Sequence, residues 1–179
     1  ISVQLAEETE EKSEAFKAGY KNIADISKER IKRAAKQIKE DNQDYDGDLG
    51  MKVFKLQESN FKQWRKLNTT DADELAKQIK MFVDPVSEDA INENMLYELL
   101  LKSGKDLNSS IVLKDKVYYI NDNELVILLD EVSQDIIDAV ISETPNKVRV
   151  LDKLFGGNDK LKTNTKLQMD DAGIEFKTI

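Results

Sequence analysis

The sequence predicts an α/β fold in which a mixed β-sheet carries packed helices, preceded by a helical N-terminal region. Three observations predict it. Strand-like apolar runs follow one another between residues 111 and 130, separated by short polar turns. Segments with a helical apolar stripe stand before and after these runs. A final strand–helix–strand pattern over 147–179 is typical of a parallel strand pair inside a mixed sheet.

The N-terminal region is expected to contain one strand and two helices. Residues 1–5 are rich in β-branched and apolar side chains, which predicts the end of a buried strand. Thr9 is a suitable N-cap for a first helix over 10–19. A second helix over 22–41 follows, because apolar side chains recur there on one face. The polar, acidic stretch 41–48 predicts a linker.

The middle of the chain is expected to add one strand and two helices. Residues 51–56 alternate between apolar and charged side chains, as a half-buried strand does. Helical stretches over 70–82 and 87–102 follow, and the second carries a clear apolar stripe. Gly104 is placed to end that second helix.

The C-terminal part supplies most of the predicted sheet. Residues 111–113, 117–120 and 124–130 predict an antiparallel meander. A helix beginning at Ser133 leads to a strand over 147–151. A last helix, capped by Asn158 or Asp159 and closed by Gly173, leads into a strand over 174–179. The paired glycines Gly156 and Gly157 before that helix are better explained by this cap than by a phosphate-binding loop.

Composition excludes several kinds of chemistry. The 179 residues contain no cysteine and no histidine. Disulfides, thiolate metal sites and catalysis by serine–histidine or cysteine–histidine pairs are therefore excluded within this chain. The net charge of −8 limits any nucleic-acid contact to a local basic patch. The acidic stretch 41–48 does not keep the spacing of a calcium loop, so we assign no metal site.

The location of the chain is expected from the same features. No apolar run approaches the roughly 20 residues that a membrane-spanning helix needs, so we expect no membrane association. A sequence without cysteine fits the cytoplasm. The chain opens at Ile1 without an initiator methionine, and we expect it to be an internal part of a longer protein.

Several stretches together resemble a known family and keep that family's order along the chain. They are residues 3–5 with Glu7, 11–24 leading into 28–34, 52–56 with 59–62 and Trp64, 96–104, 150–152, 157–164 and 172–178. Together they resemble the C-terminal third of the modification subunits of type III restriction-modification systems. They are fingerprints of the family and carry no chemical motif of their own.

The resemblance implies a parent enzyme that transfers a methyl group from S-adenosylmethionine to N6 of adenine in DNA. It also implies a homodimer of modification subunits and a partner restriction subunit. Residues 1–45 would then be a remnant of a Rossmann-like methyltransferase core, a strand plus two helices. Residues 50–179 would form a C-terminal α/β assembly domain.

The catalytic motifs of that family are absent from the sequence. Its tetrapeptide, an acidic or amide residue followed by two prolines and an aromatic residue, has no match. The nearest string, residues 84–87, lacks the second proline and the aromatic ring and predicts a turn. The glycine-containing cofactor loop is also missing. We therefore assign no catalytic residue and expect this chain alone not to methylate DNA.

Two polar residues near the N-terminus are cofactor candidates by the resemblance. Gln4 and Glu7 would stand at the end of a strand of the methyltransferase sheet, where a polar group binds the ribose of S-adenosylmethionine. The alternative is a polar strand terminus with no ligand. We favour the alternative for this chain and keep the cofactor role for the intact parent.

Two basic stretches are candidates for contact with the DNA backbone. Lys28, Lys32 and Lys36, with Lys39, form a stripe on the helix over 22–41, and Arg33 flanks it. Charged stripes of this kind are more often solvated helix faces, and we favour that interpretation. Lys62 and Arg65 surround the only tryptophan, an arrangement that suits stacking on a base. A tryptophan is more often a core anchor, which we also favour here.

The leading hypothesis from the sequence is an assembly module. A well-patterned domain without catalytic motifs would hold two modification subunits together, and would also hold the restriction subunit. The competing hypothesis is a domain that contacts the DNA backbone through the two basic stretches.

Overall fold

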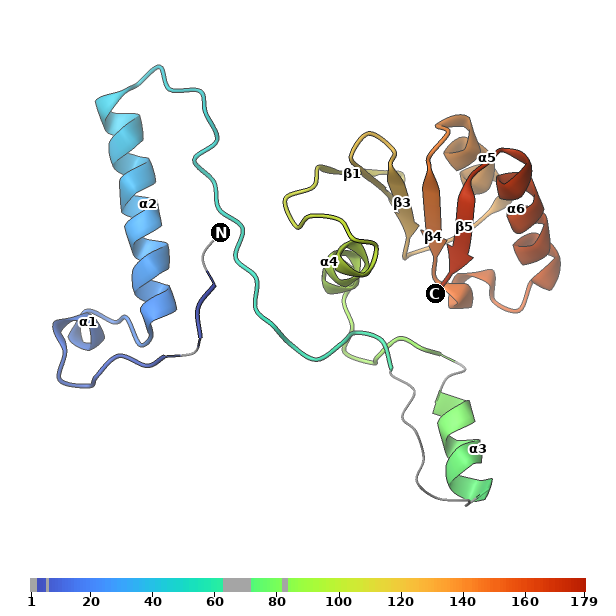
Figure 1. The fold of residues 1–179 in the computed structure, drawn as a ribbon, viewed down its shortest axis with the longest axis horizontal. Coiled ribbons are helices and arrows are strands. Elements are labelled where there is room, and N and C mark those ends of the chain that lie inside the picture. The colour runs from blue at the N-terminus through green and yellow to red at the C-terminus, as the bar shows by residue number, and fades with distance from the viewer. Residues whose placement is uncertain (1–2, 6, 63–71, 82–83) are drawn as a thin grey trace. The chain divides into compact units, whose positions relative to one another are not determined.

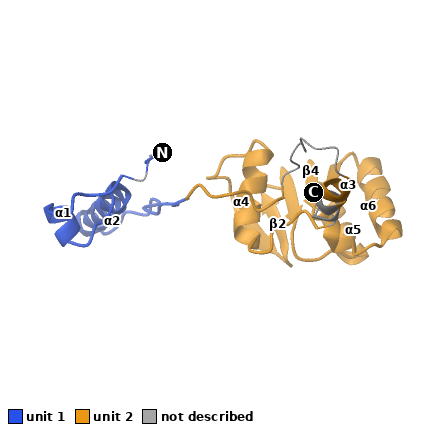
Figure 2. Cartoon of the chain, turned by 90° about the horizontal axis from the view of Figure 1, so that it is seen from below, with its two compact units in different colours: residues 1–54 blue, residues 55–179 orange. Residues whose placement is uncertain are grey.

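The computed structural model describes residues 3–5, 7–62, 72–81 and 84–179. The chain divides into two compact units, an N-terminal unit of residues 1–54 and a C-terminal unit of residues 55–179 (Figure 2). Within the described residues, no helix is both long enough and apolar enough to cross a membrane.

The N-terminal unit is helical. Helix α1 (Glu14–Lys17) is capped by Ser13, whose Oγ accepts a hydrogen bond from the amide of Phe16. Helix α2 (Ile23–Asp41) is capped by Asn22, whose side chain accepts from the amide of Asp25 at 2.8 Å. The prediction of a long amphipathic helix here is confirmed.

Two predictions for this unit are wrong. Of the strand predicted over residues 1–5, residues 1 and 2 lie outside the described residues. Residues 3–5 form no strand and are exposed, because the described part of the unit offers no neighbouring strand. The predicted helix over 10–19 is reduced to α1. Its expected cap, Thr9, instead donates its hydroxyl to the carbonyl of Tyr20 at 2.6 Å, which ties the chain to the start of α2.

The C-terminal unit contains a five-stranded sheet and several helices (Figure 1). The helices are α3 (Ala72–Met81), α4 (Asn92–Lys102), α5 (Gln134–Ser142), the 3-10 helix η1 (Asp152–Phe155) and α6 (Asp159–Asp171). The strands are β1 (Ile111–Lys114), β2 (Val117–Ile120), β3 (Leu125–Leu128), β4 (Lys147–Val150) and β5 (Glu175–Thr178).

The strands lie in the order of the sequence, β1-β2-β3-β4-β5. The β1–β2 and β2–β3 pairs are antiparallel, whereas β3–β4 and β4–β5 are parallel. The predicted meander and the predicted parallel pair are both present. The α/β fold class, with a mixed sheet and packed helices, is therefore confirmed.

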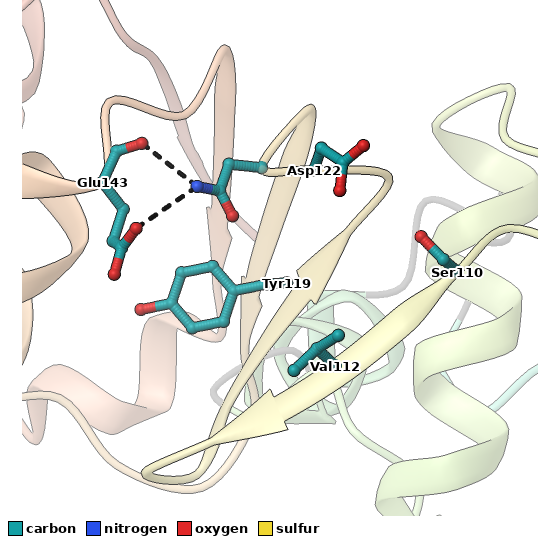
Figure 3. Close-up of a pocket in the computed structure, with 6 residues that line it drawn as sticks. Ser110, Val112, Tyr119, Asp122 and Glu143 are labelled. Atoms are coloured by element: carbon teal, nitrogen blue, oxygen red, sulfur yellow. Dashed lines mark hydrogen bonds between the residues drawn. The ribbon is translucent and has the colours of Figure 1, made fainter.

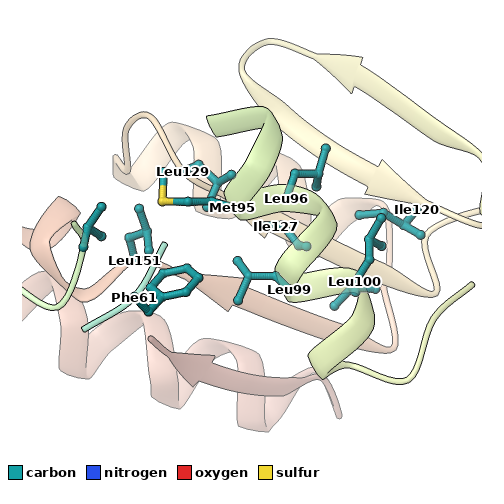
Figure 4. Close-up of a cluster of buried hydrophobic side chains, with 11 residues drawn as sticks. Phe61, Met95, Leu96, Leu99, Leu100, Ile120, Ile127, Leu129 and Leu151 are labelled. Carbon is teal, nitrogen blue, oxygen red and sulfur yellow. The ribbon is translucent and has the colours of Figure 1, made fainter. Parts of the chain in front are cut away.

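Helices cover the two faces of the sheet over different strands. On one face, the side chains of α4 form a core with inward-facing residues of β2 and β3, such as Ile120 and Ile127 (Figure 4). On the other face, α5 and α6 pack on residues of β3 and β4, such as Val126 and Val148. All four residues of β3 are buried, because this strand has a core on both sides.

Caps and turns agree with the sequence. The Ser133 hydroxyl accepts from the amide of Ile136, and the Asn158 side chain accepts from the amide of Leu161 at 3.0 Å. The predicted N-caps of α5 and α6 are thus confirmed, and the loop before α6 serves that cap.

Two predictions for the C-terminal unit and the segment before it are wrong. Residues 51–56 form no strand. The helix expected over 87–102 begins only at Asn92. The segment before Asn92 is extended where it leaves the turn, because Val86 forms an isolated antiparallel bridge with Phe61.

Candidate functional site

The basic stripe of α2 is largely occupied by ion pairs within the helix. Lys28 lies 2.6 Å from Asp25, and Lys36 lies 3.5 Å from Glu40. The Nε of Arg33 donates to Glu29 at 2.7 Å, and this hydrogen bond is the main cause that raises the pKa of the guanidinium. These pairs are half-buried or exposed, so each contributes little to stability, but they offset the positive charge of the stripe.

Other cations of α2 remain open to solvent. Arg30, Lys32 and Lys39 are exposed and have no ion-pair partner within the described part of the chain. Sequence reasoning grouped the cations by helical spacing alone. The structure separates them into paired and unpaired sets, because Asp25, Glu29 and Glu40 pair with Lys28, Arg33 and Lys36. Lys32 also lies three positions from Glu29, but that carboxylate pairs with Arg33.

Gln4 and Glu7 both lie near the beginning of α2. The hydroxyl of Ser27 is 3.4 Å from Oε1 of Gln4. The backbone carbonyl of Glu7 accepts from the amide of Ile23 at 3.1 Å. Both side chains are exposed, and the structure gives no contact that joins them into one site.

The second basic stretch is described only in part. The Lys62 ammonium donates to the backbone carbonyl of Asp84 at 2.9 Å, so it stabilises the bridge between Phe61 and Val86. The side chain of Asp84 accepts from the amide of Val86 at 3.0 Å, as expected for the predicted turn. Trp64 and Arg65 lie outside the described residues.

A partly buried carboxylate on α4 holds the beginning of the C-terminal unit. Glu98 accepts from the Ser59 hydroxyl, and it accepts from both the backbone amide and the side-chain amide of Asn60 at 2.8 Å. The ammonium of Lys102 lies 2.8 Å from the same carboxylate and 4.8 Å from the centre of the Phe61 ring. We call these four polar residues, Ser59, Asn60, Glu98 and Lys102, the Glu98 anchor.

The environment of Glu98 fixes its charge. Burial by itself raises its pKa, but the hydrogen bonds from Lys102, Ser59 and Asn60 together outweigh that effect, so that the pKa falls to about 2. Sequence reasoning missed this anchor. The available signal was an acidic side chain among the apolar residues of α4, whose partners lie 38 and 39 positions earlier in the chain.

A small cavity lies at the corner of the sheet formed by β1 and β2 (Figure 3). Its volume is about 150 Å³, and Val112, Tyr119 and Glu143 are among the residues that line it. Asn123 joins the end of α5 to this corner by donating to the backbone carbonyl of Glu143 at 3.2 Å. The pKa of Tyr119 is raised by burial and by the negative charge of Glu143.

The outer edge of β1 is apolar and open. Val112 and Leu113 are 60% and 59% exposed, whereas β3 has no exposed side chain. At the opposite edge of the sheet, the exposed residues of β5 are charged: Glu175 lies 2.6 Å from Arg149 and 3.3 Å from Lys177. The β1 edge is therefore the part of the sheet best suited to bind another protein surface.

We identify no candidate metal site: the described residues contain no group of three acidic side chains placed to hold a metal ion.

Comparison with known proteins gives a local relationship. No protein-family model matches the chain. Part of the chain is similar to the modification subunit of a type III restriction-modification enzyme. That protein is the EcoP15I Mod subunit of Escherichia coli, which is 45% identical over 56 residues. The matched stretch makes up 31% of this chain and 8% of that subunit, so the chain is related to it over this stretch.

Proposed function

We propose that this chain is the C-terminal part of a type III modification subunit and that residues 55–179 form its non-catalytic assembly domain. The local likeness to a Mod subunit supports the choice of family. In this proposal the parent transfers a methyl group from S-adenosylmethionine to N6 of adenine in DNA. The cofactor binds in the parent, where Gln4 and Glu7 would face it, and this chain alone binds none.

The observation that carries the assembly role is the open apolar edge of β1. Val112 and Leu113 leave most of their surface in water, although the rest of the unit buries its large sheet residues efficiently. Burying a valine or leucine side chain completely gains about 1.5–3 kcal/mol, and a partner at this edge would gain part of that for each of the two side chains. Unpaired backbone groups of an edge strand add hydrogen bonds to such a contact.

The proposed partners are a second modification subunit and the restriction subunit. The test is sedimentation of the purified 179-residue chain over a wide range of concentrations, together with a parent subunit shortened to end before Lys55. We expect the chain to self-associate and the shortened parent to lose dimer stability. A chain that stays monomeric, together with a shortened parent that dimerises normally, contradicts the assembly role.

A second candidate function is contact with the DNA backbone, and the unpaired cations of α2 favour it. We expect this function to give binding to duplex DNA at low salt that weakens steeply as salt rises. Changing Arg30, Lys32 and Lys39 to glutamate would lower the salt dependence, by a slope of roughly three on a logarithmic plot.

The matched control for the DNA test changes the paired cations Lys28, Arg33 and Lys36 to glutamate. Because their charges are already offset by neighbouring acids, this variant would lose less salt dependence than the first. If the unaltered chain does not bind duplex DNA at low salt, this second function is excluded.

A further inference from the structure

The backbone of β1 has one satisfied side and one open side. The amide of Asn121 donates to the carbonyl of Ser110 at 3.1 Å, so the backbone groups of Ser110 point toward β2. Because these directions alternate along an antiparallel strand, Val112 and Lys114 also point toward β2. The N–H and C=O groups of Ile111 and Leu113 therefore point away from the sheet, toward the open edge.

We propose that β1 pairs antiparallel with β1 of a second copy of this chain, about a two-fold axis that passes beside Val112. This inference rests on the proposed assembly role and specifies its surface. Two five-stranded sheets would join into one continuous sheet through their β1 edges. Such a contact uses the same patch on both copies, as a symmetric dimer requires.

The side chains of β1 select this register. With the axis at Val112, the two valines face each other, Ile111 faces Leu113 of the other copy, and Lys114 faces Ser110. A shift of the axis to Leu113 would place Ile111 opposite Asp115, and Val112 opposite Lys114. The first register matches apolar with apolar residues, so cross-strand pairing favours it.

The open backbone groups also fit this register. With the axis at Val112, Ile111 and Leu113 form the two hydrogen-bonded pairs that flank it, and about four backbone hydrogen bonds connect the copies. Val112 then occupies a pair without hydrogen bonds, in which the two Cα atoms approach to about 4.5 Å.

Charge supports this arrangement on the face that carries the cavity. Ser110 and Asp122 line the same cavity beside Val112. Lys114 of the second copy, placed opposite Ser110, would bring its ammonium to the end of the cavity where the Asp122 carboxylate lies. Its own pairing with Glu143, at 3.1 Å, leaves the Lys114 side chain 61% exposed and able to make this second contact.

The size of the contact sets its strength. The five residues Ser110–Lys114 of each copy bury much less surface than the roughly 1,200–2,000 Å² of a stable protein interface. We therefore expect a reversible dimer whose population rises with concentration.

Cysteine cross-linking tests the register directly, because the chain has no cysteine of its own. Val112→Cys would place two thiols at the axis, within the Cα separation that a disulfide needs. Leu113→Cys is the matched control, since Leu113 is equally exposed. Its two copies would lie about 8 Å apart between Cα atoms, too far for a disulfide. We expect the Val112→Cys protein to form disulfide-linked dimers at least about tenfold faster than the Leu113→Cys protein.

Sedimentation of Val112→Lys tests the same axis without a covalent bond. Two lysines facing each other at the centre should weaken the dimer at least about tenfold, while the exposed site leaves the monomer folded. The control is Ile38→Lys, which places a lysine at a similarly open apolar position of α2 and should leave the dimer unchanged.

The outcomes separate this inference from the assembly role. A dimer that Val112→Lys does not weaken, with equal cross-linking by the Val112→Cys and Leu113→Cys proteins, overturns the β1 register and leaves the assembly role standing. A chain that is monomeric at every concentration overturns the inference and also counts against the assembly role.

Discussion

Helices α2 and α4 are both amphipathic, but they are used differently. Helix α2 has 19 residues and buries none of them, and its Ile31 and Ile38 are 45% and 43% exposed. Helix α4 has 11 residues and buries four, of which Leu100 has no exposed surface. The longer helix therefore contributes less to a core than the shorter one.

The difference lies in what each unit offers to cover an apolar face. Helix α4 packs on the sheet of its own unit and on Phe61. The N-terminal unit has no sheet in its described residues, so α2 has nothing there to pack against beyond the chain at its beginning. Periodicity thus predicts which face of a helix is apolar, but not whether anything covers that face.

The largest effect is expected from a matched pair of alanine substitutions, one in each helix. Leu100→Ala would leave a cavity in a closed core and should lower the free energy of unfolding of the C-terminal unit by about 2–5 kcal/mol. Ile31→Ala on α2 should change stability by less than about 1 kcal/mol, because its side chain is already half exposed. Urea denaturation followed by circular dichroism measures both. Equal effects would contradict the contrast between the helices.

A smaller effect is expected at the Glu98 anchor. Glu98→Gln would remove the charge that Lys102, Ser59 and Asn60 stabilise, and should destabilise the C-terminal unit by roughly 2–3 kcal/mol at neutral pH. The unaltered chain and the variant are compared by urea denaturation at a series of pH values.

The pH dependence of that difference has a definite sign. Glu98 has a pKa of about 2 in the folded chain, below its ordinary value of 4.5. Its contribution is therefore fully present above about pH 4.5 and is lost as the pH falls toward 2. The stability difference between the two proteins should shrink over that window. A difference that stays constant down to pH 2 would show that the carboxylate charge is not what stabilises the anchor.

The smallest effect concerns the helix caps. Asn158→Ala removes the cap of α6 and should lower the stability of the C-terminal unit by about 1 kcal/mol, since α6 carries the buried Met169. Asn22→Ala removes the equivalent cap of α2. It should reduce helical circular dichroism without moving the urea midpoint of the C-terminal unit. A shift of that midpoint by Asn22→Ala would mean that the two units unfold together.

The sheet could be predicted because its signals are local. Strands β1 to β3 follow one another through short turns. Between β4 and β5, the beginning of α6 is marked by its N-cap and its end by a glycine. The alternating pattern of residues 51–56 is an equally local signal, yet the strand predicted from it does not form. Alternation shows which side chains would share a face of a strand, but it does not show whether another strand lies alongside.

The candidate sites divide in the same way. Helical spacing placed the cations of α2 on one surface, but it did not identify which of them pair with acids of the same helix. The Glu98 anchor joins residues 38 and 39 positions apart, so only the folded chain brings Ser59 and Asn60 to α4. Whether Gln4, Glu7 or the cations bind a ligand stays a prediction.

Strand β3 is the strand that helices cover on both faces of the sheet. It is the strand at which the antiparallel and parallel halves meet, and none of Leu125, Val126, Ile127 and Leu128 has any exposed surface. Its amide hydrogens are thus shielded by a strand on each side and by a core above and below. They should be the last in the chain to exchange with heavy water, because their release requires the whole unit to open.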